Sequence, residues 1–127
     1  MKILQLDHVA IHVQDVAISQ DFYREVLQLE ELPRPAFDFP GAWFRLGETQ
    51  ELHLIGERKL EVHSQRRGNH FALQIEDPDF WENELLSRQV EYMRKLRPDG
   101  AHQIFVQDPD RHWIELCCLE RLPNVME

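Results

Sequence analysis

A chain of 127 residues, of which 43% are hydrophobic and 29% charged, has the composition expected of one soluble globular domain. Its longest apolar runs fall short of the ~20 residues of a membrane span, and its first residues lack the features of a secretion signal. The formal charge of −9 disfavours nucleic acids and anionic membranes as partners, and the adjacent pair Cys117 and Cys118 is typical of free thiols in the cytoplasm.

One phrase of the sequence occurs twice. Residues 8–15 read His-Val-Ala-Ile-His-Val-Gln-Asp and residues 70–77 read His-Phe-Ala-Leu-Gln-Ile-Glu-Asp, at an offset of 70 − 8 = 62. The same offset relates residues 52–54, Leu-His-Leu, to residues 114–116, Ile-Glu-Leu. Two copies of this length are unlike the short units of a repeat array, so we predict two similar modules related by a pseudo-twofold axis.

The first module opens with an alternating segment. In residues 6–13, His8 and His12 share one face and apolar side chains occupy the other, as in a half-buried strand. Asp15 is a suitable N-cap, and the apolar stripe behind it predicts a helix that ends near Leu27 or Leu29.

Several prolines then interrupt the chain, so residues 33–41 are expected to form a loop. Residues 42–46 and 51–55 read as a hairpin whose more polar face carries His53. Residues 56–69 hold few apolar side chains and are interpreted as the connection between the modules.

The second module repeats this order. We expect a strand over 70–75, a cap at Asp77-Pro78, a helix over 79–88, a strand near 90–95, a turn at 98–100, and a hairpin of 103–107 and 113–118. Each module is thus a βαβββ unit, and the fold class is α+β. Eight strands would form one curved, mostly antiparallel sheet with the helices on its outer face, in a single domain with modules at about 1–56 and 69–120.

Three motifs resemble the vicinal-oxygen-chelate superfamily, which includes glyoxalase I, methylmalonyl-CoA epimerase, extradiol dioxygenases, and fosfomycin- and bleomycin-resistance proteins. They are Asp-His-Val-Ala-Ile at 7–11, Asp-Phe-Tyr-Arg-Glu-Val-Leu at 21–27, and Asp-Pro-Asp-Arg-His-Trp-Ile-Glu-Leu at 108–116. The resemblance extends over nearly the whole chain. It implies paired βαβββ modules, which family members often assemble as homodimers, with a metal site completed within one chain or shared between two.

The resemblance also implies metal ligands on the first and last strands of each module. Here these positions hold His8, His53, His70 and Glu115, which fall at matched places in the repeat and on the predicted inner face. A lone histidine on a strand is more often a structural residue than a ligand, but four matched positions are not independent. Imidazole and carboxylate ligands suit Zn²⁺, Ni²⁺, Fe²⁺, Co²⁺ or Mn²⁺ at distances of about 2.0–2.3 Å.

The chain departs from glyoxalase I and the epimerase at His53, where those relatives carry Glu or Gln. Neutral imidazole would leave a divalent site with more positive charge and one base fewer, so proton abstraction would fall to Glu115 or to a metal-bound hydroxide. We therefore predict a metal-dependent lyase or isomerase that chelates vicinal oxygens of a small molecule and acts through a metal-stabilised enolate. Whether His53 binds the metal or lines the pocket is left open.

Two alternatives are kept. An Fe(II) extradiol dioxygenase needs only His8, His70 and Glu115, but its signature has Tyr where Phe105 stands and Gly or Pro where Arg111 stands. The other alternative is a protein that holds metal and ligand without turnover. Fosfomycin-type thiol transferases are disfavoured because we find no inward basic cluster beyond Arg45. The short basic run at 66–67, which bears on charged partners, is explained by a solvated loop.

Further inward positions are expected to contact the substrate. Histidine and glutamine on the opening strands would hydrogen-bond its oxygens, aromatic residues would form apolar walls, and an arginine would meet an anionic group. These residues are His12, Gln74, Trp43, Phe105 and Arg45.

Overall fold

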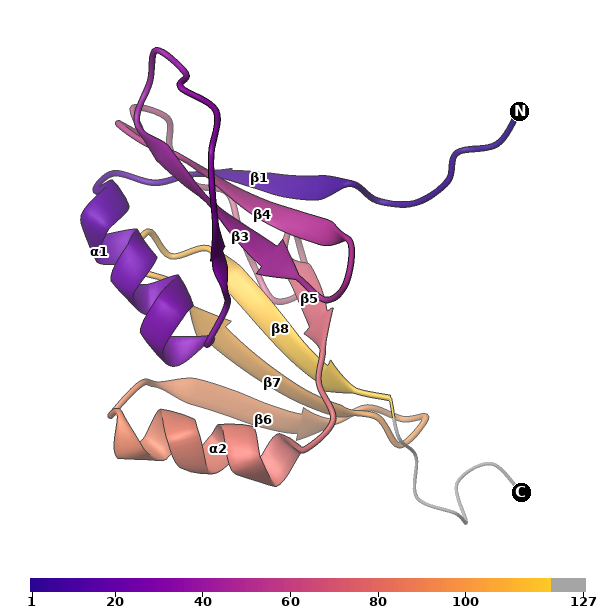
Figure 1. The fold of residues 1–127 in the computed structure, drawn as a ribbon. Helices are drawn as coiled ribbons and strands as arrows, with labels where there is room; N and C mark the ends of the chain where they lie inside the picture. Colours follow the sequence, from indigo (N-terminus) through magenta and orange to yellow (C-terminus); the bar gives the residue numbers. More distant parts are fainter. Residues whose placement is uncertain (120–127) are drawn as a thin grey trace. The chain divides into compact units, whose positions relative to one another are not determined.

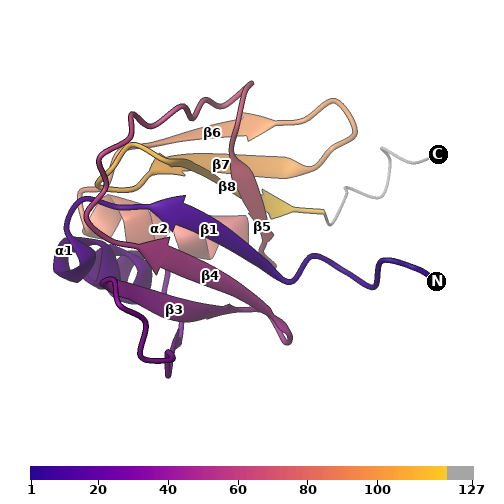
Figure 2. The ribbon, with the colours of Figure 1, turned by 90° about the horizontal axis from the view of Figure 1, so that it is seen from above.

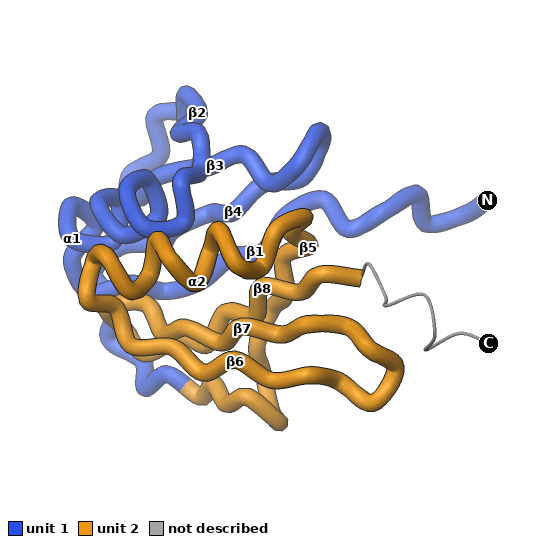
Figure 3. The backbone as a smooth tube through the Cα atoms, turned by 90° about the horizontal axis from the view of Figure 1, so that it is seen from below, with its two compact units in different colours: residues 1–62 blue, residues 63–127 orange. Residues whose placement is uncertain are grey.

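The structure is a computed structural model that describes residues 1–119. The chain divides into two compact units, residues 1–62 and residues 63–127 (Figure 3). None of the described helices is both long enough and apolar enough to cross a membrane.

Unit 1 is a four-stranded sheet with one helical segment (Figure 1). Strand β1 runs parallel to β4, and the other pairs are antiparallel, so the order across the sheet is β1-β4-β3-β2. Figure 2 shows β1, β4 and β3 side by side. The elements are β1 (His8–His12), α1 (Val16–Asp21), the π-helix η1 (Phe22–Val26), β2 (Glu31–Leu32), β3 (Gly41–Leu46) and β4 (Gln50–Ile55).

Unit 2 has the same order of elements and the same sheet topology, β5-β8-β7-β6, with β5 parallel to β8. The α+β class and the twofold βαβββ repeat are therefore confirmed. The strands form two four-stranded sheets, and their union in one eight-stranded sheet and one domain stays a prediction. The elements are β5 (Phe71–Gln74), α2 (Pro78–Ser87), β6 (Tyr92–Leu96), β7 (His102–Gln107) and β8 (Trp113–Cys118).

Both helices begin where the sequence predicts. The Asp15 carboxylate accepts a hydrogen bond of 3.3 Å from the Ile18 N–H, and the Asp77 carboxylate accepts one of 3.1 Å from the Phe80 N–H. Pro78 occupies the first turn of α2, where its missing N–H costs nothing. The first helix continues to Val26, as expected, but its second half has π-helical hydrogen bonds.

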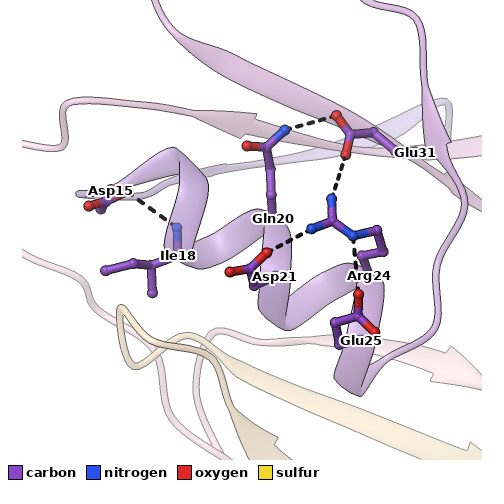
Figure 4. Close-up of polar contacts among 7 residues, drawn as sticks. All are labelled: Asp15, Ile18, Gln20, Asp21, Arg24, Glu25 and Glu31. Atoms are coloured by element: carbon purple, nitrogen blue, oxygen red, sulfur yellow. Dashed lines mark hydrogen bonds and ion pairs between the residues drawn. The ribbon is translucent and has the colours of Figure 1, made fainter.

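Strand β2 lies just before the proline-rich segment, and it is too short for the alternation of apolar and polar residues that identifies a strand. Its two residues pair with Phe44 and Trp43 of β3. Figure 4 shows the Glu31 carboxylate accepting hydrogen bonds from Gln20 at 2.8 Å and from Arg24 at 3.3 Å. These contacts from the helical segment, rather than strand propensity, hold β2 in place.

Each helix covers one face of its sheet. Helix α1 contacts β3 and β4, and α2 contacts β7 and β8. The side chains on the covered faces are almost completely buried and form the core of each unit. They include Val13, Tyr23, Phe44, Leu52 and Leu54 in unit 1, and Leu85, Ile104, Val106, Ile114 and Leu116 in unit 2.

Arg111, in the turn between β7 and β8, has φ of 69°, in the left-handed region that favours glycine. Asp108 stabilises this turn, because its carboxylate accepts hydrogen bonds from the N–H groups of Asp110 at 2.9 Å and His112 at 2.8 Å.

Candidate functional site

The sheet face opposite the helix of each unit carries the side chains that could bind a metal or a substrate. In unit 1, His8 lies beside Glu51, and Ala10 and Trp43 lie beside His53 in the strand register. Residues that pair directly across strands point to the same side of a sheet. The predicted residues of β1, β3 and β4 thus share one face, namely His8, His12, Trp43, Arg45 and His53.

Three rings on this face are stacked. The imidazoles of His8 and His53 are 4.1 Å apart between centroids, and Trp43 covers the other side of His53 at 4.0 Å. The Nε2 atom of His53 lies 2.9 Å from the carboxylate of Glu51. The Nδ1 atom of His8 lies 2.9 Å from the carboxylate of Asp7, so an Nδ1–H donor there leaves Nε2 with its lone pair.

Stacking limits how His8 and His53 can bind one ion. The lone pairs of an imidazole lie in the ring plane, and these two planes are only 16° apart. Neighbouring parallel rings do not direct their lone pairs at one point between them. One ring would have to turn before both could bind the same metal.

In unit 2, His70 and Glu115 are in direct contact. The Nε2 atom of His70 is 3.2 Å from Oε1 of Glu115, while its Nδ1 is 3.2 Å from the carbonyl oxygen of Gly68. Gln103 donates a hydrogen bond of 3.1 Å to the other carboxylate oxygen, Oε2. The residue Glu115 is 6% exposed, and its carboxylate is held in one orientation by groups on both sides.

The chemistry of this pair fits a divalent transition metal. Two ligand atoms bound at about 2.1 Å on adjacent positions of one ion are separated by about 3.0–3.4 Å, which includes the observed separation of 3.2 Å. Within residues 1–119, no three His, Cys, Asp or Glu side chains gather as a complete metal centre. Each unit thus supplies a pair of candidate ligands, and the convergence of all four stays a prediction.

Cys117 also shares the face of Glu115, because it follows two residues later on β8. Burial raises the pKa of its thiol above the usual value, and the nearby charge of Glu115 raises it further. The thiol is therefore held in its protonated form, which is a poor metal ligand.

The predicted substrate residues differ in their surroundings. Phe105 lies opposite Glu115 in the register, with its ring 6.0 Å from that of His70. It helps to line a cavity of about 310 Å³ in unit 2, together with Met93 and Trp113. Arg45 donates to the carbonyl oxygen of Glu48 in the hairpin turn at 3.1 Å. His12 and Gln74 are exposed at the ends of β1 and β5.

The sequence reasoning missed two residues of this site. Glu51 contacts His53, and Gln103 contacts Glu115. A signal for Glu51 was present, because it lies two residues before His53 and therefore on the same face of a strand. Gln103 likewise lies two residues before Phe105 and so on the inward face, but its contact with Glu115 on the neighbouring strand has no signal in the sequence.

Comparison with known proteins identifies the family of this fold. Residues 5–116 match the family model of the glyoxalase/bleomycin resistance protein/dioxygenase superfamily. The chain is 30% identical to Glyoxylase I 4 of Arabidopsis thaliana, over 98% of this chain and 76% of that protein. It is also 30% identical to the metallothiol transferase FosB of Bacillus licheniformis, over 91% of this chain and 75% of that protein.

A solved structure of the same family has a similar fold. A putative glyoxalase family protein from Bacillus anthracis superposes with a TM-score of 0.82 at 27% identity, covering 94% of this chain and 98% of the other. The paired βαβββ units and the three motifs have the same explanation: the chain belongs to the glyoxalase/bleomycin resistance protein/dioxygenase superfamily.

Proposed function

We propose that the protein is a divalent-metal-dependent enzyme of glyoxalase type, a lyase or isomerase acting on a small molecule with two neighbouring oxygens. His8, His70 and Glu115 would hold the metal. His53 would pack against His8 and take part in ligation only after its ring turns. Glu115 would serve as the general base.

The contact between His70 and Glu115 carries this proposal. Two candidate metal ligands, an imidazole nitrogen and a carboxylate oxygen, lie 3.2 Å apart. Each is also held by a second partner, Gly68 for the imidazole and Gln103 for the carboxylate. Such outer contacts fix the tautomer and direction of metal ligands.

The roles of the residues follow from their atoms. A bound metal would supply Lewis acidity that stabilises negative charge on a substrate oxygen. His70 directs Nε2 toward the site because its Nδ1 faces a carbonyl oxygen. Because Oε1 of Glu115 lies beside His70 and would bind the metal, the proton from the carbon next to the chelated oxygens would go to Oε2, which Gln103 orients. Phe105 keeps water away from that proton transfer.

The test is a comparison of purified wild-type protein and Glu115→Gln. Elemental analysis identifies the metal, and hemithioacetals, acyl-CoA esters and catechols are screened as substrates. We expect Glu115→Gln to keep a weakened metal site and to lose turnover by a factor of about 10²–10⁴, the range for a missing general base.

Glu84→Gln on α2 is the matched control, because it makes the same chemical change at a carboxylate that pairs only loosely with Arg88, at 4.0 Å. It should leave turnover unchanged. Full turnover by metal-loaded Glu115→Gln would exclude Glu115 as the base. Oxygen consumption with a catechol and bound iron would favour ring cleavage instead.

A second candidate is metal-dependent transfer of a thiol. It is favoured by the relative named metallothiol transferase, which is as similar to this chain as the relative named glyoxylase. Consumption of a thiol with an epoxide co-substrate, in place of isomerisation, would identify it.

A further inference from the structure

A second cavity of about 530 Å³ in unit 2 is distinct in its charge. It is lined by Gln65, Arg66, Arg67, Lys95 and Trp113, so three of its five residues are cations and none is acidic. We call it the basic cavity. It stands out in a chain whose formal charge is −9.

The segment before β5 folds into a turn that holds this cavity in shape. The N–H of Gln65 donates to the carbonyl of Asn69 at 2.9 Å, and the hydroxyl oxygen of Ser64 accepts from the N–H of Trp113 at 2.8 Å. The turn is thereby tied to the start of β8. The guanidinium of Arg66 lies over the ring of Trp113, 5.5 Å from its centroid.

The cations of the basic cavity are not neutralised within the described chain. Arg24, Arg94 and Arg97 each form an ion pair with a carboxylate at 2.7–2.8 Å. In residues 1–119, no carboxylate pairs with Arg66, Arg67 or Lys95, and the hydrogen bond of Arg66 goes to the sulfur of Met93. Like charges around one cavity repel each other, and a bound anion relieves that repulsion.

The basic cavity lies on the same sheet face as Glu115. Lys95 is opposite Gln103 in the register, and Gln103 donates directly to Glu115. Trp113 precedes Glu115 by two residues on β8, which places their backbones about 7 Å apart. One small molecule can therefore reach both the basic cavity and the carboxylate.

We propose that the basic cavity binds a phosphate or phosphonate dianion, and that the substrate carries such a group in addition to its chelating oxygens. The second part of this proposal rests on the proposed function, whereas anion binding itself does not. Three cationic donors match the three terminal oxygens of such a group, and guanidinium binds them in bidentate fashion. A carboxylate has one charge and two oxygens and uses fewer of these donors.

This inference bears on two sequence-based expectations. The run at 66–67 lies in a turn between strands, consistent with the expected loop, and that turn is fixed beside Trp113. Lys95 adds a cation to the inner face, where only Arg45 was expected. The inward face is thus more basic than the sequence suggested.

The test uses the full, metal-free chain titrated with inorganic phosphate, methylphosphonate and acetate. Binding is followed by NMR through the assigned indole N–H of Trp113. We expect phosphate and methylphosphonate to bind with Kd near or below about 1 mM and acetate at least about tenfold more weakly. The double substitution Arg67→Gln, Lys95→Gln should weaken phosphate binding at least about tenfold, because it removes two of the three cations that attract the anion.

The matched control is Lys59→Gln, Arg88→Gln, which removes the same charge at exposed positions outside the basic cavity and should bind phosphate like the wild type. Circular dichroism checks the fold of both. His70→Gln should also bind phosphate normally, so loss of the proposed enzyme site and loss of the anion site are distinguishable. Phosphate binding that is absent at about 10 mM, equal in both double variants, or no tighter than that of acetate would overturn the proposal.

Discussion

At the scale of single residues, the three candidate histidines present different atoms to the site. His8 and His70 have Nδ1 beside a neighbouring oxygen, at 2.9 Å and 3.2 Å, and the Nε2 atom of His70 lies 3.2 Å from the carboxylate of Glu115, the other candidate ligand of its unit. His53 instead has Nε2 beside Glu51 and its ring enclosed between two others. The first arrangement is typical of metal-binding histidines, while the second is typical of a ring that supports a neighbour.

This difference predicts unequal effects of substitution. His70→Gln should lower metal affinity by at least about 10²-fold, because a ligand directed at the metal is lost. His53→Gln, which installs a residue that relatives carry there, should lower it by less than about tenfold. Metal affinity measured by competition with a chelator provides the comparison. Equal losses in the two variants would show that His53 ligates as strongly as His70.

At the scale of elements, each helix starts from an aspartate cap and then packs on its sheet. The cap of α2 is the stronger of the two by geometry, at 3.1 Å against 3.3 Å in α1. Its position matters for the site, because α2 contacts β7 and β8, the strands that carry Phe105 and Glu115. A defect at the start of α2 should therefore reduce stability without removing any group of the site.

We expect Asp77→Ala to lower the free energy of unfolding by about 1 kcal/mol, because the N–H of Phe80 loses its acceptor. Urea denaturation measures the change. Asp77→Ser keeps an acceptor oxygen at the cap and should recover most of the lost stability. If serine proved as destabilising as alanine, the hydrogen bond would not be the cause.

At the scale of the whole molecule, each unit contributes one pair of candidate ligands. His8 and His53 belong to unit 1, and His70 and Glu115 belong to unit 2. A complete set can thus come from the two units of one chain or from units of two chains.

We predict a homodimer, to be measured by sedimentation equilibrium at micromolar concentration. Mixing His8→Ala with Glu115→Ala subunits tests where the site lies. Because a shared site would combine intact halves from different chains, the mixture should regain metal binding if sites are shared. A monomer would refute the dimer, and a dimeric mixture without regained binding would assign the site to a single chain.

The sequence by itself determined the repeat, the α+β class and the face on which each candidate residue lies. Strand alternation and helix caps are local properties, so they can be read from neighbouring residues. The faces on which His8, His70 and Glu115 lie were predicted in this way, whereas their role as metal ligands was implied by the resemblance and stays a prediction.

Only the tertiary structure decided which side chains meet. Gln103 reaches Glu115 across a strand pair, and Arg66 reaches Trp113 because a turn is tied to the start of β8. The short strand β2 is likewise held by Gln20 and Arg24 from the helical segment. Such contacts join residues 7 to 47 positions apart, and their partners depend on register and packing, which no local pattern specifies.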